Sequence, residues 1–207
     1  MKLYYATGSS SLAIRILINE LEIPCEYELV NLGTKETENK RDFLTISPKG
    51  YVPVLLLNDD TILTECGVIL QYLADKYKAE SLLPPVENFK RYRVLEWVNF
   101  IGTELHKGLT PLIAYLFVPL APRHESFVVN IKNRLNYINK HMANNQYLTG
   151  DNFTIADAYL FVLATCLPLA KINIAEYPHV HAYFSRLTNR KSILESLKAE
   201  GLSGFLN

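Results

Sequence analysis

The sequence is poor in cysteine, has no net charge and contains no long apolar run. Its 207 residues include three cysteines, Cys25, Cys66 and Cys166, an odd number at wide spacing, which argues against a disulfide framework or a zinc site and for a reducing compartment. Lys plus Arg and Asp plus Glu each number 21, so the basic surface of nucleic-acid and anionic-membrane binders is lacking. No run approaches the ~20 apolar residues of a membrane helix, and the first residues are too short in apolar length for a signal peptide. We therefore expect a cytosolic protein.

Several motifs of cofactor and metal chemistry are also absent from the sequence. It contains no glycine-rich phosphate loop, no G-x-G-x-x-G, no H-E-x-x-H and no C-x-x-C. His179 and His181 stand two apart in an expected helix, which points them to different faces. We interpret them as solvated histidines and expect no metal site.

Charge and periodicity divide the chain in two. Residues 1–80 hold 8 basic and 12 acidic side chains, whereas residues 81–207 hold 13 and 9 and all five histidines. The first part mixes strand and helix patterns, and the second is helical almost throughout. Adjacent prolines at 84 and 85 cannot lie inside a helix. We therefore predict a domain over 1–80, a linker over 81–88 and a helical domain over 89–207.

The first part predicts the element order βαβ, helix, ββα, with a parallel opening pair and an antiparallel hairpin. Its expected elements are a strand at Lys2–Tyr5, a helix behind Ser9–Ser11 that Pro24 stops, a strand at Glu26–Leu32, a short helix at Asn39–Ile46, strands at Val52–Leu57 and Thr61–Leu63, and a helix from about Glu65.

The second part predicts five helical stretches. They cover Phe89 to about Phe117, kinked at Pro111, then Ser126–Met142, a helix beginning at Phe153–Asp157, and two shorter helices near Pro178–Leu187 and Ser192–Glu200. Thr154 and Asp157 fit the [ST]-x-x-[DE] pattern, in which the threonine caps a backbone N–H and the acid reaches back. We expect both to be structural.

Three local patterns point to a ligand site, each with a plainer alternative. Around Val52-Pro53 a strand begins at a proline, so the Val52 backbone could pair with a peptide-like ligand, or the proline simply caps an edge strand. Glu65 and Cys66 stand at a helix start that favours a bound carboxylate, with Glu65 placed to take an ammonium, or Glu65 only offsets the helix dipole. A polar row on the long helix forms a cleft wall or an ordinary solvent face; its members are Asn99, Thr103, His106 and Thr110.

Taken together, these patterns and the element order resemble the cytosolic glutathione transferases over essentially the whole chain, most closely the bacterial beta class. The motifs that carry the resemblance are Met1–Tyr5, Gly8–Ala13, Ser47–Pro53, Gln71–Asp75, Thr103–Gly108 and Phe153–Phe161. The resemblance implies a thioredoxin-like N-terminal domain, an all-helical C-terminal domain and a homodimer, with glutathione as co-substrate and no other cofactor.

The resemblance also implies roles for individual residues. Pro53 is expected to be a cis proline, and Val52 to pair with the cysteinyl backbone of glutathione. Glu65 and Cys66 would hold the γ-glutamyl end, and Lys35 would approach the glycine carboxylate. His106 would lie near the sulfur, while Asn99 and Thr103 would reach the neighbouring subunit's site.

One position departs from the class pattern, because Ser10 stands where a cysteine is expected. The expected chemistry is attack of the glutathione thiolate on an electrophilic carbon. Ser10 and Ser11, at a helix start, are the first candidates to stabilise that thiolate, with Tyr5 and His106 next. Apolar side chains of the long helix, Tyr115 and Phe117, would line the electrophile site.

Two other functions remain open from the sequence. The chain could be a non-catalytic glutathione-binding or regulatory protein with the transferase fold. It could also be a glutathione-dependent reductase, which Ser10 disfavours because that chemistry wants a thiol at this position.

Overall fold

The computed structural model describes residues 1–114 and 124–206 of the chain. They form two compact units, one comprising Met1–Ala79 with the segment from Arg190 onward, the other Glu80–Asn189. The sequence analysis placed everything from 89 to 207 in a single helical domain. In the structure, however, the last segment packs with the first unit, because helix α9 (Lys191–Ala199) lies against α1 (Ser11–Glu20).

The first unit is built on a mixed sheet with strand order β3-β2-β1-β4-β5. Its strands are β1 (Lys2–Tyr5), β2 (Glu26–Asn31), β3 (Glu36–Thr37), β4 (Val54–Leu56) and β5 (Ile62–Thr64). β1 and β2 run parallel, and the other neighbouring pairs are antiparallel. The predicted βαβ start and the following hairpin are therefore confirmed, and the fold class is the expected thioredoxin-like sheet unit followed by helices.

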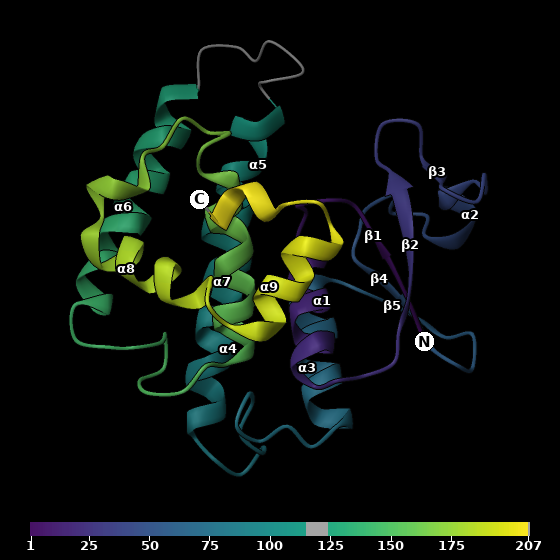
Figure 1. The fold of residues 1–207 in the computed structure, drawn as a ribbon, viewed down its shortest axis with the longest axis horizontal. Helices are drawn as coiled ribbons and strands as arrows, with labels where there is room; N and C mark the ends of the chain where they lie inside the picture. Colours follow the sequence, from purple (N-terminus) through teal and green to yellow (C-terminus); the bar gives the residue numbers. More distant parts are fainter. Residues whose placement is uncertain (115–123, 207) are drawn as a thin grey trace. The chain divides into compact units, whose positions relative to one another are not determined.

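Alternating side chains of the sheet pack on two sets of helices. On one side lie α1 and α3 (Cys66–Lys76), and α9 packs on α1 (Figure 1). A second cluster forms around Tyr4, with Val30, Val54 and Phe43 of the short helix α2 (Phe43–Ile46). Successive strand residues point to opposite faces, so Leu3 and Tyr4 are both buried although they serve different layers.

The second unit is helical. It contains α4 (Lys90–Phe100), the π-helix η1 (Ile101–His106), α5 (Lys107–Ala114), α6 (His124–Met142), α7 (Ile155–Cys166), the short turn η2 (Ile174–Glu176) and α8 (Pro178–Leu187). Apolar residues fill α7 almost completely, and they pack against α4, η1 and α8 (Figure 1). The predicted stretch to Phe117 extends beyond the described residues, and Pro111 lies inside α5.

The start of α7 is organised by Asp157, whose side chain is fully buried. Its carboxylate accepts the backbone N–H of Thr154 at 2.8 Å and of Leu148 at 2.9 Å, and the hydroxyls of Thr154 at 2.7 Å and Tyr183 at 2.8 Å. The predicted capping box is present. Burial raises the pKa of Asp157, and these donors oppose the rise. The residue therefore connects the α7 start to the preceding loop and to α8.

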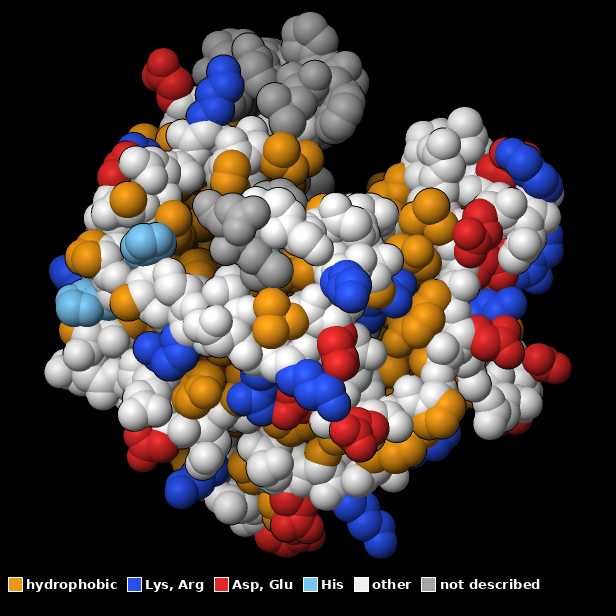
Figure 2. Space-filling view, in the orientation of Figure 1, with side chains coloured by type: hydrophobic (Ala, Val, Ile, Leu, Met, Phe, Trp, Pro, Cys, Tyr) orange, Lys and Arg blue, Asp and Glu red, His pale blue; other side chains and the backbone are white. Residues whose placement is uncertain are grey.

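Charged side chains of both signs are interspersed on the surface. In the face shown in Figure 2, lysine and arginine alternate with aspartate and glutamate, without a patch of one sign. Among the described residues, no helix has both the length and the apolar character to cross a bilayer.

Candidate functional site

The turn between β1 and α1 carries three serines that differ in how their hydroxyls are used. Ser11 is fully buried, and its hydroxyl lies 2.7 Å from that of Ser9 and donates to the Ala6 carbonyl at 3.3 Å. Ser10 occupies the cap position of α1, and its hydroxyl makes no capping hydrogen bond to the described helix. Of the two serines nominated from the sequence, Ser11 therefore holds the turn together, whereas Ser10 leaves its hydroxyl unused as a cap.

The start of α3 meets the start of α1. The Cys66 thiol donates to the Ser10 carbonyl over 3.5 Å. Glu65, immediately before α3, has a backbone φ of 73°, a left-handed value that is costly for a side chain with a Cβ and is concentrated at functional positions. The first N–H groups of a helix lack acceptors within it and favour anions. Two such helix ends, with Ser10 and Glu65 at them, are thus brought together in the first unit.

The loop before β4 joins this cluster. The peptide bond between Val52 and Pro53 is cis, as the resemblance implied, and Val52 lies before the first residue of β4 in the register with β1. Lys49 donates to the Glu65 carboxylate at 2.7 Å and to the Thr64 hydroxyl at 3.1 Å. The sequence analysis included Lys49 in a motif but gave it no role, because only the fold brings it to Glu65.

Lys35, which precedes the edge strand β3, also contacts the loop before β4. Its ammonium donates to the Gly50 carbonyl at 2.9 Å and lies 5.3 Å from the centre of the Tyr51 ring. It therefore places a positive charge two residues from Val52, in keeping with the anion-binding role expected of it.

Tyr5 is held by packing. The Arg15 guanidinium carbon lies 4.5 Å from the centre of the Tyr5 ring and 3.7 Å from that of Tyr27. Arg15 donates to the Glu200 carboxylate at 3.0 Å, and the same carboxylate accepts the Gly8 N–H at 2.9 Å. Gly8 has a φ of +68°, which favours glycine. Glu200 thus fastens the serine-bearing turn, a contact 192 residues apart along the chain that no local pattern signals.

The polar row of the second unit follows α4, η1 and α5. Asn99, Thr103 and Thr110 are exposed and His106 is half-buried. Thr103 donates to the Asn99 carbonyl at 3.0 Å and Thr110 to the His106 carbonyl at 2.8 Å. The His106 Nδ1 lies 2.8 Å from the hydroxyl of Tyr159, a residue that the sequence analysis named only as part of a motif. Tyr115 and Phe117, expected to line the electrophile site, lie outside the described residues.

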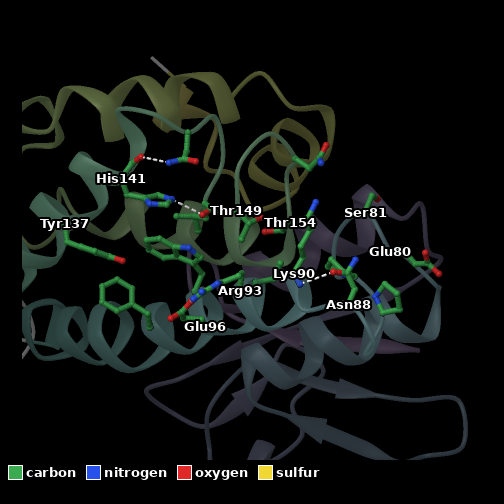
Figure 3. A pocket seen from close by; sticks show the side chains of 18 residues that line it. Glu80, Ser81, Asn88, Lys90, Arg93, Glu96, Tyr137, His141, Thr149 and Thr154 are labelled. Atoms are coloured by element: carbon green, nitrogen blue, oxygen red, sulfur yellow. Dashed lines mark hydrogen bonds and ion pairs between the residues drawn. The ribbon is translucent and has the colours of Figure 1, made fainter.

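The second unit also contains a cavity of about 890 Å³ between α4, α6 and the loops around them (Figure 3). Trp97 stacks on Tyr137 there with ring centres 5.7 Å apart, and it lies 4.8 Å from the His141 ring. None of the residues that the sequence analysis proposed for the ligand site lines this cavity, although the capping residue Thr154 does. Within residues 1–114 and 124–206, no group of three metal-ligating side chains comes together.

The sheet unit with two helix starts and a cis-proline loop at one site, followed by a helical unit, is the two-domain arrangement expected of the cytosolic glutathione transferases. Residues 3–81 match the family model of the glutathione S-transferase N-terminal domain, and residues 104–191 match that of the C-terminal domain. The chain is 40% identical to the glutathione S-transferase GstA of Escherichia coli O157:H7, covering 98% of this chain and 100% of that protein.

Solved structures of glutathione S-transferases are also similar to this chain over nearly its whole length. A sphingomonad glutathione S-transferase complexed with glutathione is 36% identical with a TM-score of 0.91, covering 98% of this chain and 100% of that one. A beta-class enzyme from Sphingomonas chungbukensis is 35% identical with a TM-score of 0.91 and the same coverage. The chain therefore belongs to the glutathione S-transferase family, and the resemblance read from its motifs is confirmed.

Proposed function

We propose that the protein conjugates the thiolate of glutathione to electrophilic, mostly apolar small molecules. Glutathione is the co-substrate, and the reaction needs no further cofactor. Family membership supports the reaction class. The observation that carries the proposal within this chain is the Ser10 hydroxyl, which makes no capping hydrogen bond to the described helix at the point where α1 and α3 begin.

In this proposal the first unit binds glutathione through four kinds of contact. The Val52 backbone pairs with the cysteinyl backbone, beside Pro53, because Val52 lies outside the sheet register. Glu65 takes the ammonium of the γ-glutamyl end, and the start of α3 at Cys66 takes its carboxylate. Lys35 attracts the glycine carboxylate.

Activation of the thiol sets the energetic requirement. A thiol with an ordinary pKa of ~8.5 is only about 3% thiolate at pH 7. Lowering that pKa by about two units takes roughly 2.7 kcal/mol of preferential stabilisation of the charged form. A hydrogen bond to a charged acceptor contributes about 1.5–3 kcal/mol. One hydrogen bond from the Ser10 hydroxyl, at a helix N-terminus, therefore stabilises the thiolate by about the required amount. Ser11 and Tyr5 are weaker candidates for this role, because the Ser11 hydroxyl already donates to Ala6 and the Tyr5 ring packs on Arg15.

The second unit contributes His106, which we propose donates to the sulfur. Asn99 and Thr103 are proposed to serve the neighbouring subunit of a homodimer, a state that the family resemblance and the opposite charges of residues 1–80 and 81–207 support. Light scattering at micromolar concentration is expected to give twice the monomer mass of 23.6 kDa, and a monomeric mass would reject this part. All three cysteines are free thiols, in keeping with a cytoplasmic location.

The deciding experiment is a titration of bound glutathione by its thiolate absorbance. Ser10→Ala is expected to raise the pKa of the bound thiol by about one to two units. Thr7→Ala is the matched control, because Thr7 is exposed in the same turn, and it is expected to leave the titration unchanged. The titration is paired with retention on glutathione resin and with conjugation of a chlorinated nitroaromatic.

Each result selects one function. Retention with turnover, and a raised thiol pKa in Ser10→Ala, supports conjugation with Ser10 as the activating group. Retention without turnover would establish the non-catalytic binding protein instead. Turnover with an unchanged titration in Ser10→Ala would move the activating role to Ser11, and an unchanged titration in Ser11→Ala as well would move it to His106 or Tyr5.

A further inference from the structure

The hydrogen bond between His106 and Tyr159 has no role in the function proposed so far. Tyr159 lies on α7, is 4% exposed, and is flanked by the buried residues Ala158 and Leu160. Its ring stands at 83° to the imidazole with the two centres 5.9 Å apart. Because the helix around it is packed on all sides, the phenol has a fixed direction, and its hydroxyl reaches His106 Nδ1 at 2.8 Å.

The backbone that carries His106 is a π-helix, and Tyr159 lies beside it. His106 is the last residue of the π-helix Ile101–His106, a conformation that is rare and frequent at functional sites. A Cβ built on Gly102, in the same π-helix, would lie 3.7 Å from the Tyr159 hydroxyl and 3.8 Å from its ring. Tyr159 therefore lies beside the π-helix at Gly102 and is hydrogen-bonded to it at His106.

We propose that Tyr159 is the positioning residue for His106 and fixes its tautomer. A neutral imidazole carries one N–H and one acceptor nitrogen, and the partner of one nitrogen decides where the proton resides. Either atom of this pair could donate, but a phenol O–H is a stronger donor than an imidazole N–H, and an unprotonated imidazole nitrogen is a stronger acceptor than a phenol oxygen. In this proposal the Tyr159 hydroxyl is therefore the donor to Nδ1, the proton of the neutral ring resides on Nε2, and Nε2–H becomes the donor. The catalytic meaning rests on the proposed function, in which that donor serves the glutathione sulfur.

The tautomer is tested first, by a measurement that needs no turnover. Long-range ¹H–¹⁵N correlation spectra distinguish the two nitrogens of each of the five histidines, and His106→Gln identifies the His106 signals by their loss. At about two pH units above the ordinary histidine pKa of ~6.5, the Nε2–H form is expected in the native protein. Tyr159→Phe is expected to give a mixture of both tautomers.

Tyr183→Phe is the matched control. Tyr183 is 1% exposed and its hydroxyl is also bonded within the second unit, but to Asp157. Its loss removes an equally buried hydroxyl and is expected to leave the His106 spectrum unchanged. An Nδ1–H tautomer in the native protein, or an unchanged His106 spectrum in Tyr159→Phe, would overturn the proposal.

Kinetics then test whether the effect passes through the histidine. Tyr159→Phe is expected to lower kcat/KM about three- to tenfold, the loss of one neutral hydrogen bond. In a His106→Ala background the same change is expected to have no further effect, and a loss that persists there would reject the positioning role. If His106→Ala alone leaves conjugation unchanged, the histidine part of the proposed function fails, and the spectra still decide whether Tyr159 sets the tautomer.

Discussion

Removal of the Asp157 carboxylate should destabilise the second unit far more than the loss of an ordinary helix cap. A cap is typically worth about 0.5–2 kcal/mol. Asp157, however, accepts four hydrogen bonds in a fully buried position. In Asp157→Ala, the backbone N–H groups of Leu148 and Thr154 lose their acceptor and have no freedom to turn elsewhere. At about 1–3 kcal/mol for each buried donor left unpaired, the two amides alone cost about 2–6 kcal/mol.

The amide variant tests whether acceptor capacity is what matters. Each carboxylate oxygen of Asp157 accepts two hydrogen bonds. The Leu148 N–H and the Tyr183 hydroxyl donate to Oδ1, and the N–H and hydroxyl of Thr154 donate to Oδ2. Whichever way an asparagine turns, its NH₂ group faces donors. We therefore expect Asp157→Asn to be nearly as destabilising as Asp157→Ala, although its shape is conserved.

The assay can use the one tryptophan of the chain as a reporter inside the same unit. Trp97 is 8% exposed and packs on Tyr137 and His141, so its fluorescence changes when the second unit unfolds in urea. Asp151→Ala is the control, because Asp151 is exposed near the start of the same helix. Activity per folded molecule is expected to persist at low temperature. An Asp157→Ala midpoint equal to that of the control, or unchanged stability with lost activity, would refute the structural assignment.

Three further outcomes follow from the first unit. Burial opposes ionisation of Glu28, but hydrogen bonds led by the one from Arg41 outweigh burial and lower the pKa of Glu28 to about 2. The ionised Glu28 therefore stabilises the folded state fully above its ordinary pKa of 4.5, and this contribution is lost as the pH falls toward 2. Glu28→Gln should make the stability measured in acid unfolding depend less on pH between these two values. Glu65→Gln should weaken glutathione binding about tenfold or more in calorimetry, since an ion-paired hydrogen bond is lost, whereas an unchanged Kd would exclude Glu65 as the ammonium acceptor. Glu200→Ala should cost about 3–5 kcal/mol in urea unfolding because Arg15 is left buried without its partner, and a change below about 1 kcal/mol would contradict this.

Elements with a strong local cause could be predicted closely from sequence. Helix α8 begins at Pro178 and ends at Leu187 as expected, because proline is favoured at the first helical position. The helix expected over Asn39–Ile46 begins only at Phe43. Lys40 has a φ of 62°, which a helix does not permit. Asp42 is the N-cap of the helix, and its carboxylate accepts the Leu44 N–H with an O···N distance of 2.9 Å. The two-residue strand β3 was missed because it is too short to show alternation.

The site residues differ in the same way: some could be predicted from local motifs, and others depend on contacts between residues far apart in the sequence. Ser10, Val52 and Glu65 lie in short motifs with a local reason to bind ligand, and the fold brings their elements together in the first unit. The π-helix was not predicted, because a period of 3.6 residues was applied throughout and the wider turn has no composition of its own. Tyr159 and Glu200 act through partners far away in sequence, so only the folded chain shows them.

The environments of the three cysteines bear on which chemistry this fold performs. Thiol–disulfide exchange needs a protein thiolate. Burial raises the pKa of Cys25 to about 11, which leaves about one thiolate in ten thousand at pH 7, and burial also raises the pKa of Cys166. Cys66, beside Ser10, is buried and donates its proton to a carbonyl, so it does not replace the cysteine absent at position 10. Conjugation takes its sulfur from glutathione and needs only a donor such as Ser10, which is why these residues favour the transferase over the reductase.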